Sequence, residues 1–289
     1  MTDRDHRGRA GPPAWGLEEL VRVALAEDVG ARDVTAEAVV PAGAAGRARI
    51  VQKAPGVLFG MDAARETMRQ CGVKDFRSLA PEGEWREEVP ADVAVASGAA
   101  ASLLAAERTA LNLLCHLSGI ATLTARHVRE VAGSAARILD TRKTTPGLRA
   151  LEKQAVAAGG GTNHRMGLYD AILIKENHVA LAGGLEVAVA RARETGMAVE
   201  VECRDLGEVG QALAAGADRI LLDNMAPAQL SEAVAMRGGA DGPAFEASGG
   251  VHLGNVAEVA ATGVDFISVG ALTHSAPALD LSMLIETGQ

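Results

Sequence analysis

Short apolar runs rich in β-branched residues alternate with alanine-rich segments of helical periodicity in the second half of the chain. These runs predict strands at RILDTRK (137–143), AILIKEN (171–177), AVEVECR (198–204), RILLDNM (219–225), AFEASGG (244–250) and FISVGAL (266–272). They recur roughly every 20 to 35 residues, the length of one strand-and-helix unit in an α/β barrel. Because a full barrel has about eight such units, we predict an α/β fold that is an incomplete or irregular barrel. A doubly wound sheet is the alternative.

The first half of the chain has a mixed pattern that predicts an α+β unit. Helical periodicity covers 17–27 and 62–71, and strand patterns cover 46–52, 56–59 and 93–95. An alanine- and leucine-rich stretch over 99–131 predicts a long helix that breaks near Ser118 and Gly119. We therefore predict a mobile leader at 1–16, an N-terminal α+β domain at 17–130 that includes the long helical stretch, and an α/β-barrel-like domain at 131–289. The last helix is expected to pack back on the N-terminal domain.

Composition excludes several classes of protein. The chain has 289 residues, of which 48% are hydrophobic, so it can bury a sizeable core and is not a mostly disordered chain. It lacks an apolar run of the roughly 18 residues that a membrane span needs, and its start lacks the apolar core of an export signal. The net charge of −9 argues against a nucleic-acid partner. We therefore expect a cytoplasmic protein.

The three cysteines, Cys71, Cys115 and Cys203, have no CxxC spacing and lie in apolar surroundings. This pattern argues against a disulfide framework and against a zinc site. We expect them to be buried thiols.

Charged residues recur where the predicted strands of the second half end. Parallel strands in a barrel are buried on both faces, so charges inside them are costly and gather at the carboxyl ends. A solvent-exposed face would instead scatter its charges along helices. The charged positions are Asp140, Arg142, Lys143, Lys175, Glu176, Glu200, Glu202 and Asp223.

The last two predicted strands end in small residues instead. Ser248-Gly249-Gly250 and Gly270-Ala271 each place glycine just before a helical pattern. Glycine lets the backbone approach an anion closely, and late strand ends are the usual phosphate site of α/β barrels. Either pair alone could be an ordinary tight turn, but two in succession predict a phosphate site.

A cluster of cations forms the other candidate feature. Arg142, Lys143, His164, Arg165 and Lys175 belong to two successive units, and several converging cations in an acidic protein predict a polyanionic ligand. Surface salt bridges are the plainer interpretation of any one of them. Lys175 also supports a competing hypothesis, because Schiff-base aldolases carry their lysine at a barrel strand end.

The residues around these positions resemble the quinolinate phosphoribosyltransferase family. The matching stretches include AERTALNLLCHLSGIAT, LDTRKTTPGLRALEKQAV, GGGTNHRMGLYDAILIKENH, EVEC, ILLDN, SGGV and VGALTHS, and the resemblance runs from about residue 17 to the end. It implies transfer of phosphoribosyl from phosphoribosyl pyrophosphate to quinolinate with decarboxylation, in NAD biosynthesis. A group of homologues associated with molybdenum transport shares much of this pattern, and a non-catalytic role of that kind is a further alternative.

The resemblance also implies roles for particular residues. Quinolinate is expected to bind Arg108, Thr141, Arg142, Lys143, His164, Arg165 and Lys175. Lys143, Glu202 and Asp223 are expected to serve catalysis, the two carboxylates also by holding Mg2+ directly or indirectly. The 5′-phosphate is expected at Ser248, Gly249, Gly250, Val269, Gly270 and Ala271. A homodimer with shared active sites, or a higher oligomer, is expected, with Arg108 reaching the partner's site.

Overall fold

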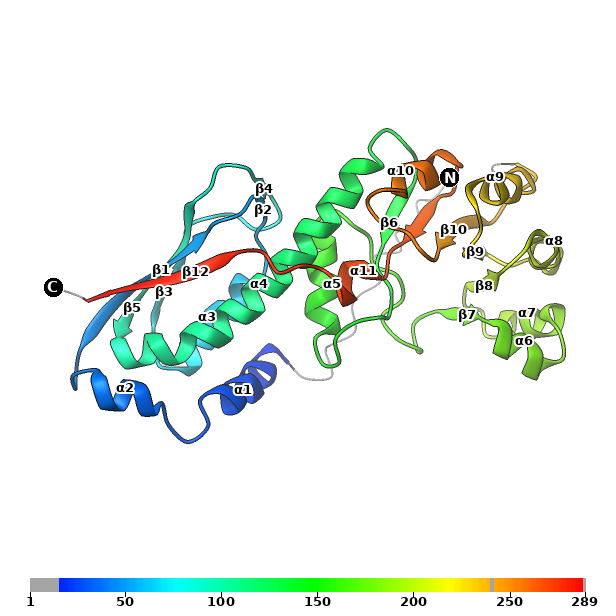
Figure 1. Cartoon of the computed structure of the whole chain (residues 1–289). Coiled ribbons are helices and arrows are strands. Elements are labelled where there is room, and N and C mark those ends of the chain that lie inside the picture. Colours follow the sequence, from blue (N-terminus) through cyan, green and yellow to red (C-terminus); the bar gives the residue numbers. More distant parts are fainter. Residues whose placement is uncertain (1–15, 240–241, 288–289) are drawn as a thin grey trace. The chain divides into compact units, whose positions relative to one another are not determined.

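The computed structural model describes residues 16–239 and 242–287, and they form two compact units made of separate stretches of chain (Figure 1). The barrel unit holds the described residues of Arg126–Lys143 and Gly161–His274. The N-terminal unit holds 16–125, Thr144–Gly160 and 275–287. The predicted leader at 1–16 lies outside the described residues, except for Gly16.

Six parallel strands form the sheet of the barrel unit: β6 (Arg137–Leu139), β7 (Ile172–Ile174), β8 (Val199–Cys203), β9 (Arg219–Asp223), β10 (Ala244–Ser248) and β11 (Phe266–Ser268). Their spatial order is β6-β11-β10-β9-β8-β7. From β7 to β11, strands that follow one another in sequence are thus neighbours, and the last strand, β11, pairs with the first, β6, as in a barrel. A doubly wound sheet would reverse its order at a switch point.

The sheet is an incomplete barrel, as predicted. In the described part of the chain β6 and β7 form the two edges, and Thr162 makes a parallel bridge to Leu139 on the outer side of β6. The helices of this unit are α6 (Glu176–Ala182), α7 (Leu185–Arg193), α8 (Leu206–Ala215), α9 (Pro227–Ala235), α10 (Val256–Ala261) and α11 (Ala271–His274). Figure 1 shows α7 to α10 following the arc of the strands on its outside.

The N-terminal unit is an α+β unit, also as predicted. Its antiparallel sheet has the order β12-β1-β5-β3, and a separate pair joins β2 to β4. In β1, alternate residues from Gly46 to Ile50 are buried and the residues between them are not. The buried face packs with α3 and α4 through residues such as Ile50, Met68 and Leu114. The strands are β1 (Ala45–Gln52), β2 (Gly56–Val57), β3 (Asp75–Ser78), β4 (Trp85–Arg86), β5 (Ala91–Ala99) and β12 (Leu281–Thr287), and the helices are α1 (Leu17–Asp28), α2 (Val34–Val39), α3 (Met61–Gln70), α4 (Ala100–Glu130) and α5 (Arg149–Ala158).

Helix α4 is continuous over 31 residues, so the predicted break near Ser118 and Gly119 is wrong. Ser118 Oγ donates to the Phe59 carbonyl and accepts from the Phe59 amide. A Cβ at Gly119 would lie 2.2 Å from the Pro277 carbonyl oxygen. Gly119 therefore serves the close approach of another segment and does not end the helix.

The C-terminal segment joins the N-terminal unit as strand β12, whereas the last helix was expected to pack on this unit. β12 pairs antiparallel with β1 from Gly46↔Thr287 to Gln52↔Leu281. Among the described residues, no helix is long and apolar enough to cross a membrane.

Candidate active site

The carboxyl ends of the six parallel strands meet at one edge of the sheet, and the candidate residues gather there. We call this set the rim, and we include Arg165 because its charge interacts with that of Arg142. The rim consists of Thr141, Arg142, Lys143, Arg165, Lys175, Glu202, Asp223, Ser248–Gly250 and Val269–Ala271.

The strand register places a buried layer of charge on the same face as the rim carboxylates. Side chains two residues apart on a strand share a face, as do residues paired in register on neighbouring parallel strands. Glu200 and Glu202 lie two residues apart on β8, and Glu200 pairs in register with Arg219 on β9. Leu221 on β9 pairs with Glu202 on one side and with Glu246 of β10 on the other. We call Glu200, Arg219, Glu246 and the contacting His164 the buried layer.

Two carboxylates of the rim occupy neighbouring strands. Glu202 forms an ion pair with Lys175 Nζ, and Asp223 Oδ2 accepts a hydrogen bond of 2.9 Å from Asn224 Nδ2. Both carboxylates are partly exposed. Mg2+ prefers oxygen ligands and usually takes one or two carboxylates together with substrate phosphates. The donor set at these strand ends therefore fits Mg2+.

The turn after β10 is shaped by contacts that exclude a side chain. Gly249 has φ 95°, and a Cβ there would lie 2.2 Å from Asn224 Oδ1. Asn224 itself has φ 54°, and its amide donates to the Ser248 carbonyl at 2.8 Å. At Gly250, with φ 62°, a Cβ would meet nothing within 4 Å. The backbone here is thus open on one side, as an anion site requires. The sequence pattern placed this turn just before a helix, but helix α10 begins only at Val256.

Lys143, which follows β6, contacts the segment that follows β11. Thr273 Oγ1 donates to the Lys143 carbonyl at 2.8 Å, and a Cβ at Gly270 would lie 3.2 Å from Lys143 Cδ. Glycine at this position therefore leaves room for the Lys143 side chain beside the second glycine turn. Thr141 Oγ1 accepts from the Lys143 amide at 3.1 Å.

A buried aspartate holds the loop that carries His164 and Arg165. Asp140 has no exposed surface, and its carboxylate accepts from the His164 amide at 2.8 Å and from Asn163 Nδ2 at 2.6 Å. The bridge between Thr162 and Leu139 anchors the start of the same loop. The glycine-rich segment 159–161 before it therefore connects α5 to this loop.

Arg165 lies at the point where two guanidinium charges approach each other. Its Nη1 donates to the Ala171 carbonyl at 3.3 Å. Burial and the charge of Arg142 lower the pKa of Arg165. A bound dianion would relieve this repulsion, so the pair suits a carboxylate or phosphate ligand.

His164 points into the buried layer. Its Nε2 lies 3.1 Å from Glu200 Oε2 and 3.5 Å from Glu246 Oε2, and its Nδ1 accepts from the Arg165 amide at 2.7 Å. Burial alone would lower the pKa of His164, but the hydrogen bond with Glu200 and the two carboxylate charges raise it. The predicted direct contact of His164 with a substrate carboxylate stays a prediction, since both ring nitrogens face protein groups here.

Glu246 and Arg219 are functional candidates that sequence reasoning missed. Arg219 Nη1 lies 3.3 Å from Glu246 Oε2, and its guanidinium stacks 4.2 Å from the Phe266 ring centre. Burial, followed by the charge of Glu200, raises the pKa of Glu246 to about 7. The sequence did contain a signal for Glu246, because it is a charged residue inside an apolar run, two positions before Ser248.

Arg108 lies on α4 in the N-terminal unit, its side chain is 63% exposed, and Glu107 Oε1 lies 4.0 Å away. Cys71, Cys115 and Cys203 are free thiols, Cys203 buried and the other two half-buried.

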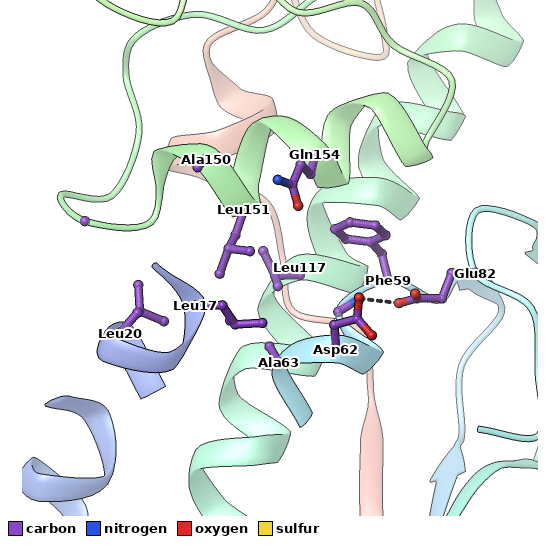
Figure 2. A pocket seen from close by; sticks show the side chains of 12 residues that line it. Leu17, Leu20, Phe59, Asp62, Ala63, Glu82, Leu117, Ala150, Leu151 and Gln154 are labelled. Atoms are coloured by element: carbon purple, nitrogen blue, oxygen red, sulfur yellow. Dashed lines mark hydrogen bonds between the residues drawn. The ribbon is translucent and has the colours of Figure 1, made fainter. Parts of the chain in front are cut away.

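A cavity of about 240 Å³ in the N-terminal unit offers different chemistry (Figure 2). Phe59, Leu117 and Leu151 give it apolar walls, and Glu82 lies at its side. Glu82 Oε1 accepts from the amides of Gly60 at 2.5 Å and Met61 at 2.8 Å, so this carboxylate is used to hold the start of α3. Among the described residues that line the cavity none is cationic. The rim is therefore the better candidate for binding a polyanion.

Comparison with known proteins covers nearly the whole chain. The family profile "Quinolinate phosphoribosyl transferase, N-terminal domain" matches residues 33–118, and "Quinolinate phosphoribosyl transferase, C-terminal domain" matches residues 120–284. A nicotinate-nucleotide pyrophosphorylase [carboxylating] of Mycobacterium leprae is 44% identical over 92% of this chain and 95% of its own length. The solved structure of the nicotinate-nucleotide pyrophosphorylase from Francisella tularensis has a TM-score of 0.88 and 39% identity, over 93% of this chain and 96% of that chain.

Proposed function

The chain belongs to the quinolinate phosphoribosyltransferase family, and from this premise we propose how its rim carries out the family's reaction. The reaction transfers phosphoribosyl from phosphoribosyl pyrophosphate to quinolinate and gives nicotinate mononucleotide, carbon dioxide and pyrophosphate. The observation that carries this assignment is the juxtaposition, at one sheet edge, of the Arg142–Arg165 pair with carboxylates and glycine turns on the other strands.

In this proposal the cations of the rim bind the two carboxylates of quinolinate. Arg142 and Arg165 supply planar donors, Lys175 supplies a compact charge, and Thr141 lies beside them. Arg165 is supported by its half-buried position, which strengthens a charge-assisted pair, and by its repulsion from Arg142. The family resemblance alone adds His164 to this set, since both of its ring nitrogens contact protein groups in this structure.

The second substrate occupies the other strand ends in this proposal. Its 5′-phosphate lies on the turns Ser248–Gly250 and Val269–Ala271, where glycine permits close backbone approach. Lys143, which passes beside Gly270, lies near the pyrophosphate that leaves. Glu202 and Asp223 stabilise the positive charge that develops at C1 of the ribose. Glu202 and Asp223 would also hold Mg2+, directly or through water, and the bound ion would neutralise phosphate charge.

The chemistry needs no protein nucleophile. The ring nitrogen of quinolinate attacks C1 as the bond to pyrophosphate breaks, so catalysis consists of positioning and charge stabilisation. The carboxylate at C2 then leaves as carbon dioxide, and the adjacent cationic nitrogen stabilises the electron pair that remains until a proton replaces it.

The direct test is an assay for nicotinate mononucleotide. Product should form only when quinolinate, phosphoribosyl pyrophosphate and Mg2+ are all present. Release of pyrophosphate without quinolinate, or no product with all three, would contradict the proposal.

We further propose a cytoplasmic homodimer in which Arg108 completes the partner's site. Support comes from its 63% exposed side chain in the N-terminal unit and from its setting in the family-like stretch AERTALN. In an isologous dimer, each of two sites then needs residues of both chains. Mixing Arg108→Ala chains with Lys143→Ala chains should restore one intact site per mixed dimer. Mixed dimers as inactive as either parent would contradict action in trans.

The aldolase alternative has little support in the surroundings of Lys175. The Lys175 side chain is 46% exposed and forms an ion pair with Glu202. A Schiff-base lysine needs a desolvated or cation-flanked setting that favours its neutral amine. Borohydride with a carbonyl substrate is therefore expected not to trap Lys175.

A further inference from the structure

The proposed reaction involves residues of the rim, and Glu200, Glu246 and Arg219 beneath the rim have no role in it. These residues lie on β8, β10 and β9, and Glu200 is 6% exposed while Glu246 has no exposed surface. Two carboxylates buried in this way, beside a half-buried guanidinium, call for an explanation, because desolvating charged groups costs free energy that their mutual attraction often does not recover.

Their contacts converge on one ring. His164 Nε2 faces Glu200 at 3.1 Å and Glu246 at 3.5 Å. Arg219 contacts Glu246 at 3.3 Å and stacks on Phe266, so it balances one of the two negative charges. On its other side, the ring accepts the Arg165 amide at 2.7 Å. The ring is therefore held between the carboxylates and the backbone of the residue that carries the rim guanidinium.

Stability alone does not account for this arrangement. Glu200 Oε1 and Glu246 Oε1 are buried without a well-aligned hydrogen-bond donor among the described residues, although a weaker contact with Ser268 favours the charged form of Glu246. A buried acceptor without a donor costs about 1–3 kcal/mol, and apolar side chains of similar volume often replace buried ion pairs without loss. A functional requirement for one orientation of the His164 ring would explain why these charged contacts are present.

We propose that Glu200 and Glu246, with Arg219 as their counter-ion, are positioning residues that hold the His164 ring and so fix Arg165 for binding the dicarboxylate substrate. This inference rests on the proposed function for the identity of that substrate. Few contacts separate these carboxylates from Arg165. Asp140 accepts a hydrogen bond from the His164 amide, the carboxylates contact the His164 ring, and the ring accepts a hydrogen bond from the amide of Arg165.

The main test is Glu246→Gln, which keeps the shape and removes the charge. We expect the KM for quinolinate to rise about tenfold, which corresponds to about 1.4 kcal/mol, and the KM for phosphoribosyl pyrophosphate to stay within about twofold. Glu258→Gln, at an exposed position of α10, is the matched control and should change neither. Equal changes in both KM values, or no change in either, would overturn the proposal.

A second measurement needs no substrate, so it separates this inference from the proposed function. The ring N–H signal of His164, assigned by comparison with His164→Gln, should be resolved by NMR in the wild type and shifted or broadened in Glu246→Gln. An unchanged signal would show that Glu246 does not hold the ring. If the signal changes while the wild type makes no nicotinate mononucleotide, the positioning stands and the proposed function fails.

A double variant guards against simple unfolding. Arg219→Met leaves two buried carboxylates without their counter-ion and should lower Tm, whereas Arg219→Met with Glu246→Gln restores the charge balance and should recover most of it. Quinolinate binding should remain weakened in the double variant. Recovery of binding together with Tm would reduce the layer to a structural role. Stoichiometric uptake of Mn2+ or Zn2+ that is lost in Glu246→Gln would also overturn the proposal, because the same three side chains could then be metal ligands.

Discussion

The rim and the buried layer carry charge on the same face of one sheet, but they differ in what they can reach. Rim side chains such as Lys175 are 46% exposed and can meet a ligand directly. Glu246 has no exposed surface and can meet only other protein groups. His164 contacts the buried carboxylates, while the next residue, Arg165, belongs to the rim.

This difference separates two kinds of effect that a mutation can have. Removing a solvent-exposed charge from an empty site changes the free energy of unfolding little, because water solvates the partner that remains. Buried charges leave a desolvated partner behind when one of them is removed. Rim variants should therefore change substrate binding and turnover with the fold intact, and buried-layer variants should also change how stability depends on pH.

The largest effect is expected for Arg165→Ala. Losing a charge-assisted pair to a desolvated carboxylate should weaken quinolinate binding by about 2–4 kcal/mol, with little change in Tm. Isothermal titration measures this. Arg191→Ala, at an exposed arginine of α7, is the control and should bind normally. Unchanged affinity in Arg165→Ala would remove this residue from the proposed site.

Asp223→Asn should give the next largest effect. The substitution keeps the side-chain shape and removes the charge proposed to stabilise the transition state, so kcat should fall by about 10- to 100-fold while quinolinate affinity stays nearly unchanged. Steady-state kinetics combined with titration separates the two. Normal turnover at saturation with lost quinolinate affinity would show that the assigned role is wrong.

Gly249→Ala tests the turn rather than a charge. A Cβ would lie 2.2 Å from Asn224 Oδ1 in a backbone conformation of φ 95°, so we expect a loss of about 1–3 kcal/mol in stability. The KM for phosphoribosyl pyrophosphate should also rise. Gly196→Ala, at φ 72° with open space around it, carries the strain without the clash and should leave that KM alone. If both variants raise it equally, the turn after β10 is not the phosphate site.

The smallest effect is expected in the pH dependence of unfolding. The pKa of Glu246 rises from 4.5 to about 7 on folding, through burial and the charge of Glu200. Between these values the folded chain binds more protons than the unfolded chain, so this group's contribution to the unfolding free energy falls as pH rises. Denaturant titrations should show a flatter profile in Glu246→Gln, by at most about one proton in slope. Parallel profiles would contradict the buried proton.

The sequence predicted the features that depend on local pattern. The six strands of the barrel unit were recognisable from their apolar runs, and the residues at their ends from the charges that such runs rarely contain. The incomplete barrel follows because only six units are visible. Gly249 and Gly270 were also recognisable as turns, since glycine marks a backbone that must be approached closely.

Features that depend on contacts between distant segments were not predictable. Gly119 indicated a helix break, yet its reason is the Pro277 backbone, more than 150 residues later in the chain. The pairing of the C-terminal segment with β1 was not predicted, because the two strands lie far apart in the sequence. The direction of the His164 ring depends on β8 and β10 together. Such contacts leave no periodic signal in either segment.

The place of β12 has a consequence for the order of events on the ribosome. β1 is an inner strand between β5 and β12, and its β12 partner, Leu281–Thr287, is synthesised after the whole of the barrel unit. Until these residues leave the exit tunnel, the backbone groups along one side of β1 have no neighbour, and an open strand edge is a template for wrong pairing. The barrel unit, by contrast, has its last strand, β11, complete at Ser268. The half of the chain that is made first is therefore finished last.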